Sequence, residues 1–313
     1  MGVIEVQAPG LLTTVQDLGR EGFGLLGVSP SGAADAVALR IGNRLVGNAE
    51  GAAGLEMTLL GGRFVFSEDA VFALTGSDFG ATLDGVPALV WTSHQAKARQ
   101  TLRVGPTSSG ARCYLCVQGG IEVQDFLGSA STHLLSGLGG HEGRALRPGD
   151  VLKIGPAKSP FRQVTVSGMA SERLAPRKVL RVTPGPQSDW FTEAARKIFY
   201  ESTYRVAEES NRMGIRLEGA AILAPTGGEM ISEGVSLGAV QVPEEGRPII
   251  LFVEQQTTGG YPKIANVISA DFHSLGQLRP RDEIRFERVG WEKARALLRE
   301  QEELMASEDM ISG

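Results

Sequence analysis

The sequence lacks any apolar run that approaches the roughly 20 residues needed for a membrane-spanning helix. Its first residues, Met1-Gly2-Val3-Ile4-Glu5, do not place a basic stretch before an apolar core, as a secretory signal would. Basic residues are also in the minority, because the net charge is -5 and the pI is about 5.6. A chain with no basic excess has no broad surface for phosphates. We therefore expect a cytoplasmic protein that inserts into no membrane and binds no nucleic acid.

Cysteine and histidine are scarce. Cys113 and Cys116 have the spacing of a redox or zinc half-site, but they lie in an apolar run that predicts a strand. Side chains three residues apart on a strand point to opposite faces, so the two sulfurs should diverge. The second cysteine pair of a zinc site is missing. We expect two inert buried thiols and no metal site, since the four histidines are scattered without metal-ligand spacing: His94, His133, His141 and His273.

Aromatic residues make up only 6% of the chain, so Val, Leu, Ile and Ala must fill the cores. Glycine is abundant instead, at 41 of 313 residues, which is roughly twice the usual share of about 7%. Without a collagen repeat, this excess predicts many tight turns between short strands. Walker-type phosphate loops and the Gly-x-Ser-x-Gly element are absent. The chain alone is therefore not expected to bind ATP.

The first half of the sequence has a predominantly β pattern. Short apolar runs separated by turn signals extend from Leu55 to Ile154, which predicts a barrel or a sandwich, and one of these runs is Ala88–Trp91. A helix is predicted before them over residues 32–46, with Asp35 in its first turn. Residues 156–177 contain three prolines and many polar residues, and they indicate an interdomain linker.

The second half begins with a strand and continues to a helix near Asp189–Tyr200. Ser188 is the predicted cap of this helix, and its predicted apolar stripe contains Trp190, Ala194, Ile198 and Phe199. Further strands follow, and residues 290–304 have the apolar spacing of a final helix. The residues beyond it, Ser307-Glu308-Asp309, are expected to be frayed.

Both halves end on a similar segment. Leu146-Arg147-Pro148-Gly149-Asp150 is matched by Leu278-Arg279-Pro280-Arg281-Asp282, and each precedes an apolar alternation. Each half also contains a helix near its start that is followed by strands. A duplicated β unit is therefore indicated, with an N-terminal domain over 1–155, a linker over 156–177, a C-terminal domain over 178–289, and a helix and tail over 290–313.

The most polar strand end of the chain is Gln255-Gln256-Thr257-Thr258-Gly259-Gly260-Tyr261-Pro262-Lys263. It follows the apolar run 248–253, which predicts a buried strand. A turn would need only the glycines and the proline. The additional amides and hydroxyls favour a surface that recognises a planar, hydrogen-bonding ligand, and the alternative is an ordinary polar loop.

Three other polar clusters lie beside glycines. Asp17 and Arg20 are three residues apart at a turn, where they either pair locally or serve a ligand. The segment 29–35 is either a plain helix start or a helix N-terminus offered to an anion. Arg212 and Arg216 flank a strand entry and suit a carboxylate or a phosphate.

In their order, these motifs resemble the biotin-dependent carboxyltransferase family, also labelled allophanate hydrolase subunit 2. The resemblance covers residues 10–289. It rests on Val15-Gln16-Asp17-Leu18-Gly19-Arg20, Ser31-Gly32-Ala33-Ala34-Asp35, Gln118-Gly119-Gly120-Ile121, Leu127-Gly128-Ser129, Ser210-Asn211-Arg212-Met213-Gly214 and Gln256-Thr257-Thr258-Gly259-Gly260-Tyr261-Pro262. Three positions depart from the family's usual pattern: Glu254 replaces Asp, Arg281 replaces Gly and Ala34 replaces Met.

The resemblance implies a mainly β fold of tandem, duplicated cyclophilin-like β-barrels with a few short helices. It implies the C component of an ATP-dependent 5-oxoprolinase, which hydrolyses 5-oxo-L-proline to L-glutamate together with a B component, of the allophanate hydrolase subunit 1 type, and an A component. ATP would act in the complex. The first alternative is the carboxyltransferase part of a urea- or guanidine-type carboxylase. Biotin would then arrive on a carrier in trans, because no Met-Lys-Met stretch is present. The second alternative is a non-catalytic regulator that binds a kinase inhibitor.

Under the 5-oxoprolinase hypothesis, the candidate catalytic residues are Lys263, Tyr261 and Asp17, with the first two near developing charge. The candidate substrate-binding residues supply amides, hydroxyls and guanidinium groups for a lactam, a ureido ring or a carboxylate: Gln256, Thr257, Thr258, Arg20, Arg212 and Gln241.

Overall fold

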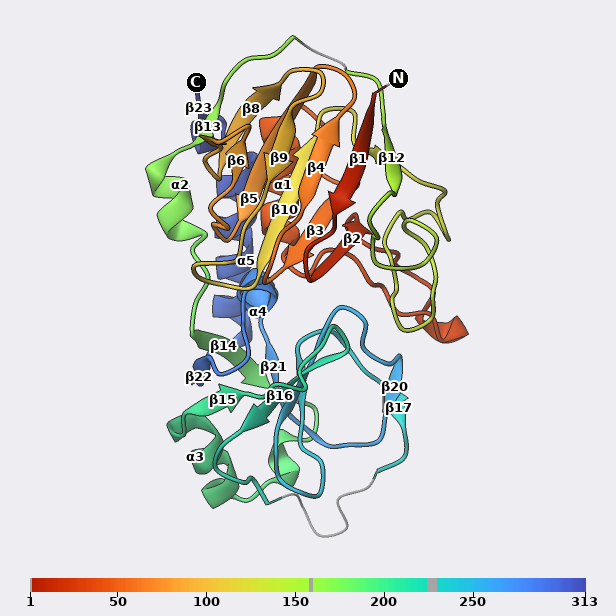
Figure 1. The fold of residues 1–313 in the computed structure, drawn as a ribbon. Helices are drawn as coiled ribbons and strands as arrows, with labels where there is room; N and C mark the ends of the chain where they lie inside the picture. Colours follow the sequence, from red (N-terminus) through yellow and green to blue (C-terminus); the bar gives the residue numbers. More distant parts are fainter. Residues whose placement is uncertain (1, 158–159, 224–229) are drawn as a thin grey trace. The chain divides into compact units, whose positions relative to one another are not determined.

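The computed structural model describes residues 2–157, 160–223 and 230–313 of the chain (Figure 1). The chain divides into two compact units. The first unit contains Met1–Arg20, Ser31–Leu174 and Leu304–Gly313, and the second contains Glu21–Pro30 and Ala175–Glu303. Among the described residues, no helix combines the length and the apolar character needed to cross a membrane.

The first unit is built on two seven-stranded antiparallel sheets. In order, the first sheet contains β11 (Ile121–Glu122), β12 (Val151–Ile154), β1 (Val3–Ala8), β4 (Arg63–Phe66), β9 (Thr101–Arg103), β6 (Thr82–Leu83) and β7 (Val86–Pro87). The second contains β2 (Leu12–Gln16), β3 (Gly54–Thr58), β10 (Arg112–Val117), β5 (Ala70–Gly76), β8 (Thr92–Ala96), β13 (Thr165–Val166) and β23 (Ile311–Ser312). One core joins residues of both sheets, including Ile4, Phe64, Leu55 and Leu74.

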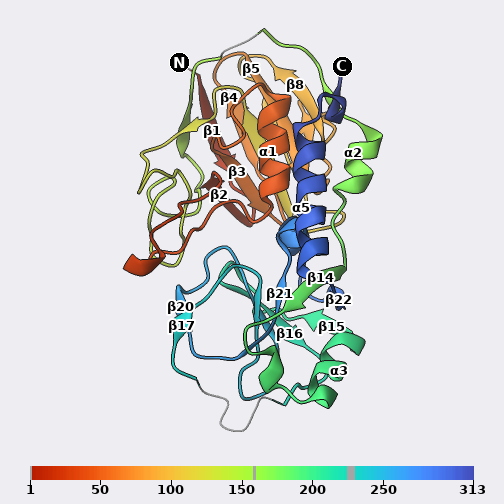
Figure 2. The same ribbon diagram turned by 180° about the vertical axis from the view of Figure 1, so that it is seen from behind.

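A second core covers the other face of the second sheet, where helix α1 (Ala36–Leu45) packs on β5 and β10 (Figure 2). Strand β10 therefore has a core on each side. Cys113 belongs to the core between the sheets, and Cys116 belongs to the core under α1. Both thiols are free and fully buried, and burial raises the pKa of each well above its usual value. The prediction of two buried thiols that diverge is confirmed, and their inertness stays a prediction.

The second unit is a closed seven-stranded barrel. Its strand order is β14 (Val179–Pro184), β21 (Lys263–Val267), β18 (Ala239–Gln241), β19 (Ile249–Leu251), β16 (Gly214–Glu218), β15 (Tyr204–Val206) and β22 (Glu283–Arg288). Helix α3 (Glu193–Glu201) packs on β22, where Phe199 stacks on Phe286 with ring centroids 4.4 Å apart. A two-stranded ribbon pairs β17 (Glu233–Gly234) with β20 (Thr258–Gly259). The predicted fold class, mainly β with tandem β units and a few short helices, is confirmed.

The remaining helices are short, apart from the last. They are α2 (Gly168–Arg173), α4 (Phe272–Gly276) and α5 (Trp291–Ala306), with single 3-10 turns η1 (Gly24–Leu26), η2 (Ser188–Trp190), η3 (Ser269–Asp271) and η4 (Glu308–Met310). Strand β13 and helix α2 lie within residues 156–177, so this segment contributes a strand to the second sheet. The predicted domain boundaries stay a prediction.

Three local predictions were wrong. Ser188 does not cap a helix: it begins η2, and Thr192 caps α3 by accepting a hydrogen bond from Ala195 N at 3.1 Å. Of the predicted apolar stripe, Phe199 is buried as predicted, while Trp190, Ala194 and Ile198 are exposed and Ala195 is buried in their place. Residues 88–91 form no strand, because Trp91 has a φ of 62° and β8 begins after it. The tail is not frayed, since Met310 is fully buried and β23 pairs with β13.

The duplicated segment has the same turn in both units. Arg147 N and Arg279 N each donate to the aspartate three residues on, at 2.7 Å, and the backbones of Asp150 and Asp282 pair with Val6 and Val206 respectively. The residue before the aspartate, which is the third of the turn, has a positive φ in both copies: 92° at Gly149 and 71° at Arg281. The hydrogen bonds therefore support the internal repeat that the short sequence match suggested.

We expect Arg281→Gly to raise the free energy of unfolding by about 1 kcal/mol, because only glycine adopts a left-handed conformation without steric cost. The lost ion pair between Arg281 and Glu208 is exposed on both sides and contributes little. Chemical denaturation measures the change. Arg281→Ala is the matched control, because it removes the same ion pair but keeps a Cβ at φ 71°. An equal gain in both variants would attribute the effect to the ion pair instead.

Asp150 should make the first unit sensitive to acid. Both Arg144 terminal nitrogens donate to its carboxylate, at 2.8 and 3.0 Å, and this contact, followed by the Arg147 amide, lowers the pKa of Asp150 from 3.8 to about 2. A lowered pKa stabilises the fold at pH values above 3.8, and this contribution is lost as the pH falls towards 2. Asp150→Asn should therefore cost about 2 kcal/mol at pH 7 and almost nothing near pH 2, as measured by urea unfolding.

Candidate functional site

In the first unit, Asp17 holds two loops together. Its carboxylate accepts hydrogen bonds from Gly19 N and Ala130 N at 2.7 Å each, and from the hydroxyls of Ser129 and Ser131. Four donors saturate most of the acceptor positions of a carboxylate. These contacts suit a residue that positions its neighbours, while the predicted catalytic role of Asp17 stays a prediction.

Arg20 binds the same loop as Asp17. Its Nε donates to Phe126 O at 3.2 Å, its Nη2 donates to Ser131 O, and its guanidinium carbon lies 5.4 Å from the centroid of the Phe126 ring. The last contact is within the range of a cation–π interaction. The structure thus brings Asp17 and Arg20 together through residues 126–131.

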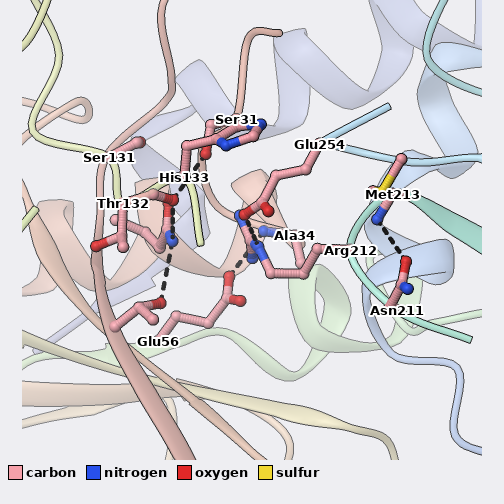
Figure 3. A network of polar contacts seen from close by, with 12 residues as sticks. Ser31, Ala34, Glu56, Ser131, Thr132, His133, Asn211, Arg212, Met213 and Glu254 are labelled. Carbon is pink, nitrogen blue, oxygen red and sulfur yellow. Dashed lines mark hydrogen bonds and ion pairs between the residues drawn. The ribbon is translucent and has the colours of Figure 1, made fainter. Parts of the chain in front are cut away.

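The segment before α1 joins this polar centre. Ser31 has a φ of 58°, and its hydroxyl donates to Thr132 O at 2.8 Å (Figure 3). Gln16 Nε2 donates to the same carbonyl at 3.1 Å. A Cβ at Gly32 would lie 2.9 Å from the backbone of Leu18 and Gly19. Glycine is therefore required where the two segments meet. The helix predicted over 32–46 begins later than predicted, at Ala36, and Asp35 lies before its first turn as the N-cap, where it accepts from Ala38 N at 2.9 Å.

Glu56, in the middle of β3, binds the segment before α1 through its carboxylate. Its Oε2 accepts hydrogen bonds from Ala34 N at 2.8 Å and from the Tyr114 hydroxyl at 2.7 Å, and its Oε1 lies 3.6 Å from Arg112 Nε (Figure 3). Burial, followed by the negative charge of Glu56, raises the pKa of Tyr114 well above its usual value. Tyr114 therefore stays a hydrogen-bond donor to Glu56. Glu56 was not among the predicted residues. A single carboxylate in the buried strand Gly54–Thr58 could have indicated it, because a buried carboxylate needs polar partners.

In the second unit, neighbouring strands bring two predicted residues together. Gln241 on β18 lies opposite Lys263 on β21, next to an irregularity in the register, and Gln256 Nε2 donates to Gln241 Oε1 at 3.3 Å. A Cβ at Gly259 would approach Gln241 Nε2 to 2.5 Å. The two amides therefore lie directly over the backbone of β20, and glycine leaves them room. We call Gln241, Gln256 and Lys263, together with Gln187 and Glu233, the amide–lysine cluster.

Lys263 is the charged centre of this cluster. Its side chain is only 3% exposed, and its Nζ lies 2.6 Å from Oε1 of Glu233, whose side chain is 43% exposed. Gln187 connects the two residues, because its Nε2 donates to Glu233 Oε1 at 2.9 Å and its Oε1 accepts from Lys263 N at 3.2 Å. Lys263 and then Gln187 lower the pKa of Glu233. Gln187 and Glu233 were not predicted, because they lie far from Lys263 along the chain.

Arg212 forms a buried ion pair. Its Nε contacts Oε1 of Glu254, and Glu254 N donates to Arg212 O at 2.8 Å (Figure 3). Arg216 is exposed on β16, so the structure separates the two arginines that were predicted to share an anion. The charge of Arg212 is thus compensated within its own unit by Glu254.

The other predicted residues lie along the ribbon. Thr258 is exposed on β20, Tyr261 is exposed just beyond it, and Thr257 O accepts from Val235 N at 3.1 Å. Their predicted roles toward a ligand, like that of Arg212, stay predictions. In the described part of the chain, no three His, Cys, Asp or Glu side chains gather closely enough to hold a metal ion.

Known proteins match this chain over most of its length. The C component of the 5-oxoprolinase of Escherichia coli (strain K12) is 41% identical over 294 residues, which cover 93% of each chain. The corresponding 5-oxoprolinase component of Haemophilus influenzae is 38% identical over 289 residues, which cover 92% of each chain.

Larger fungal proteins contain a similar region. The crystal structure of the Kluyveromyces lactis urea amidolyase superposes with a TM-score of 0.90 at 31% identity, covering 99% of this chain and 21% of that one. Urea amidolyase of Saccharomyces cerevisiae is 34% identical, over 98% of this chain and 18% of its own length. This chain therefore spans about a fifth of these proteins.

The family model described as "Carboxyltransferase domain, subdomain A and B" matches residues 26–288. This match covers most of both units and contains the polar segments that carried the resemblance, apart from residues 15–20. The chain belongs to the family of carboxyltransferase domains, subdomains A and B.

Proposed function

We propose that this chain is the C component of an ATP-dependent 5-oxoprolinase, a cytoplasmic enzyme in which the A and B components act with it to hydrolyse 5-oxo-L-proline to L-glutamate. The observation that carries this proposal is the match to the C component of a bacterial 5-oxoprolinase over 93% of both chains. The fungal relatives contain the same region only as a minor part of a longer protein.

The chemistry of the amide–lysine cluster supports the proposal. 5-Oxoproline presents a lactam N–H donor, a carbonyl acceptor and a carboxylate within one small ring. The side-chain amides of Gln241 and Gln256 each offer a donor and an acceptor, and Lys263 offers a positive charge on a buried side chain. A buried charge acts through a lower effective dielectric than an exposed one and is therefore more effective.

The lactam is unstrained, so its carbonyl carbon must become more electrophilic before water can add to it and the ring C–N bond can break, with the nitrogen leaving as the amine. Phosphoryl transfer from ATP would do this. The sequence contains no Walker-type loop, so we assign ATP binding to the complex. In this division of labour, the chain binds and orients the lactam, and a fixed cation stabilises the charge that develops on it.

Carboxyl transfer from biotin to a urea-like acceptor is the second candidate function. It is favoured by the family model and by the TM-score of 0.90 with the urea amidolyase region. A ureido ring presents the same donors and acceptor as a lactam, so the two glutamine amides suit both. Biotin would have to be supplied by a separate carrier.

Reconstitution of the chain with its A and B partners tests the first candidate. We expect glutamate release and ATP hydrolysis that depend on 5-oxoproline and disappear when this chain is omitted. Full activity without the chain would refute the proposal. The same chain, supplied with a biotin carboxylase, a biotinylated carrier and urea, should transfer no carboxyl group, and transfer in this assay would establish the second candidate instead.

A further inference from the structure

The Lys263 ammonium and the Gln187 amide together form a site that binds a carboxylate. The ammonium and the Gln187 amide both contact a single carboxylate oxygen, Glu233 Oε1, at 2.6 and 2.9 Å. The ammonium is buried and has three N–H donors, while among the described residues its recorded side-chain contact is the ion pair with Glu233. Its donor capacity is therefore incompletely used.

The cation and the anion of this pair differ in how firmly they are held. Lys263 lies in barrel strand β21 with its side chain 3% exposed, and Gln187 is also buried. Glu233 lies in β17, a strand of two exposed residues, and in the described part of the chain this strand pairs with the equally short β20 alone. The barrel thus fixes the carboxylate-binding groups, while the carboxylate itself comes from a solvent-exposed ribbon.

A second unsatisfied group lies beside this site. Gln241 is opposite Lys263 in the register, and its Nε2 is fully buried without a hydrogen-bond partner among the described residues. A buried amide donor without an acceptor is unfavourable, so a water, an ion or a ligand is needed to satisfy it. The carboxylate site therefore adjoins a position where a carbonyl oxygen would satisfy Gln241.

We propose that Glu233 stands in for the carboxylate of a ligand, which displaces it from Lys263 and Gln187 while the ligand's ring carbonyl accepts from Gln241. The ligand is a cyclic amide or cyclic urea with a carboxylate on or next to a ring nitrogen. This inference rests on the proposed function in one respect, which is the choice between two ligands that have this chemistry. 5-Oxoproline carries the carboxylate on the carbon beside the ring nitrogen, and N-carboxybiotin carries it on the nitrogen itself.

Glu233 would then act as an internal competitor. A ligand whose site is free for only a tenth of the time binds with a dissociation constant about ten times its intrinsic value. Removal of the Glu233 charge should tighten the binding of carboxylate ligands by about this factor. It should leave uncharged rings unaffected, because they do not compete for Lys263.

Calorimetric titration of the assembled complex with paired probes tests the inference. The probes are 5-oxo-L-proline and its uncharged amide, and 2-oxoimidazolidine-4-carboxylate and unsubstituted 2-imidazolidinone. Glu233→Gln should lower the dissociation constant of at least one carboxylate about tenfold and change neither uncharged probe by more than twofold. Glu208→Gln is the control, because Glu208 is also an exposed glutamate of the second unit in an ion pair.

Unchanged or weaker carboxylate binding by both Glu233→Gln and Glu233→Ala would overturn the inference, since either variant removes the competing charge. Lys263→Met should abolish the preference for the charged over the uncharged probe, and a retained preference would also overturn it. Tightening of only the cyclic urea carboxylate would support the inference while rejecting 5-oxoproline as the substrate. The two proposals can therefore fail separately.

Discussion

Glu56→Gln is expected to lower the free energy of unfolding by about 3–5 kcal/mol, which is the usual cost of removing one charge from a buried ion pair. Glu56 is 2% exposed and serves Ala34 N, the Tyr114 hydroxyl and the Arg112 guanidinium at once. Glutamine keeps the size of the side chain but removes the negative charge and one acceptor oxygen. Arg112 then stays buried without this counter-charge.

Urea unfolding followed by circular dichroism measures the loss. Glu122→Gln is the matched control, since it makes the same change at an exposed position of β11 in the same unit, where we expect less than about 0.5 kcal/mol. Adding Arg112→Met to Glu56→Gln should recover part of the stability, because the two residues are coupled. A loss below about 1 kcal/mol for Glu56→Gln would show that the buried network contributes little.

Lys263→Met in the reconstituted complex is expected to lower kcat/KM for 5-oxoproline by about 10²–10³. This is the usual effect of removing one preorganised group that stabilises developing charge. Methionine has a similar length and fits a buried position, so the barrel should fold. The loss should appear in the coupled release of glutamate and ADP.

Lys197→Met provides the control, because it removes an exposed lysine of α3 in the same unit and should leave kcat/KM within twofold. The melting temperature of the Lys263 variant should be compared with that of the wild type to exclude unfolding. If kcat/KM fell by less than threefold in a folded Lys263→Met complex, the amide–lysine cluster would not be the binding site.

Sequence patterns predicted those features that depend on local periodicity. The alternation of side chains along β10 was sufficient to predict that Cys113 and Cys116 point to opposite faces, and they lie in different cores. The helix boundary at Ser188 could not be predicted in the same way, because both Ser188 and Thr192 are good caps and the 3-10 turn between them decides the phase. Local propensity does not distinguish two such caps four residues apart.

The candidate site was predictable only in part. Gln256 and Lys263 were predicted from the polar segment 255–263, and the structure places both in the amide–lysine cluster. Gln187 and Glu233 reach this cluster from 76 and 30 residues away along the chain, counting from Lys263, through strand pairing and a side-chain amide. Such contacts depend on the register of β17, β20 and β21, which no pattern within one strand encodes.

The turn that occurs in both units shows how a duplicated element can diverge. Its backbone hydrogen bonds and its positive φ are the same in both copies, while the residue at that φ is glycine in one and arginine in the other. The geometry of the turn is thus more similar between the two copies than its residues are. Ancient tandem repeats in β proteins should therefore be detectable by aligning hydrogen-bond patterns at left-handed positions, even where alignment of amino acids no longer finds the ancestor.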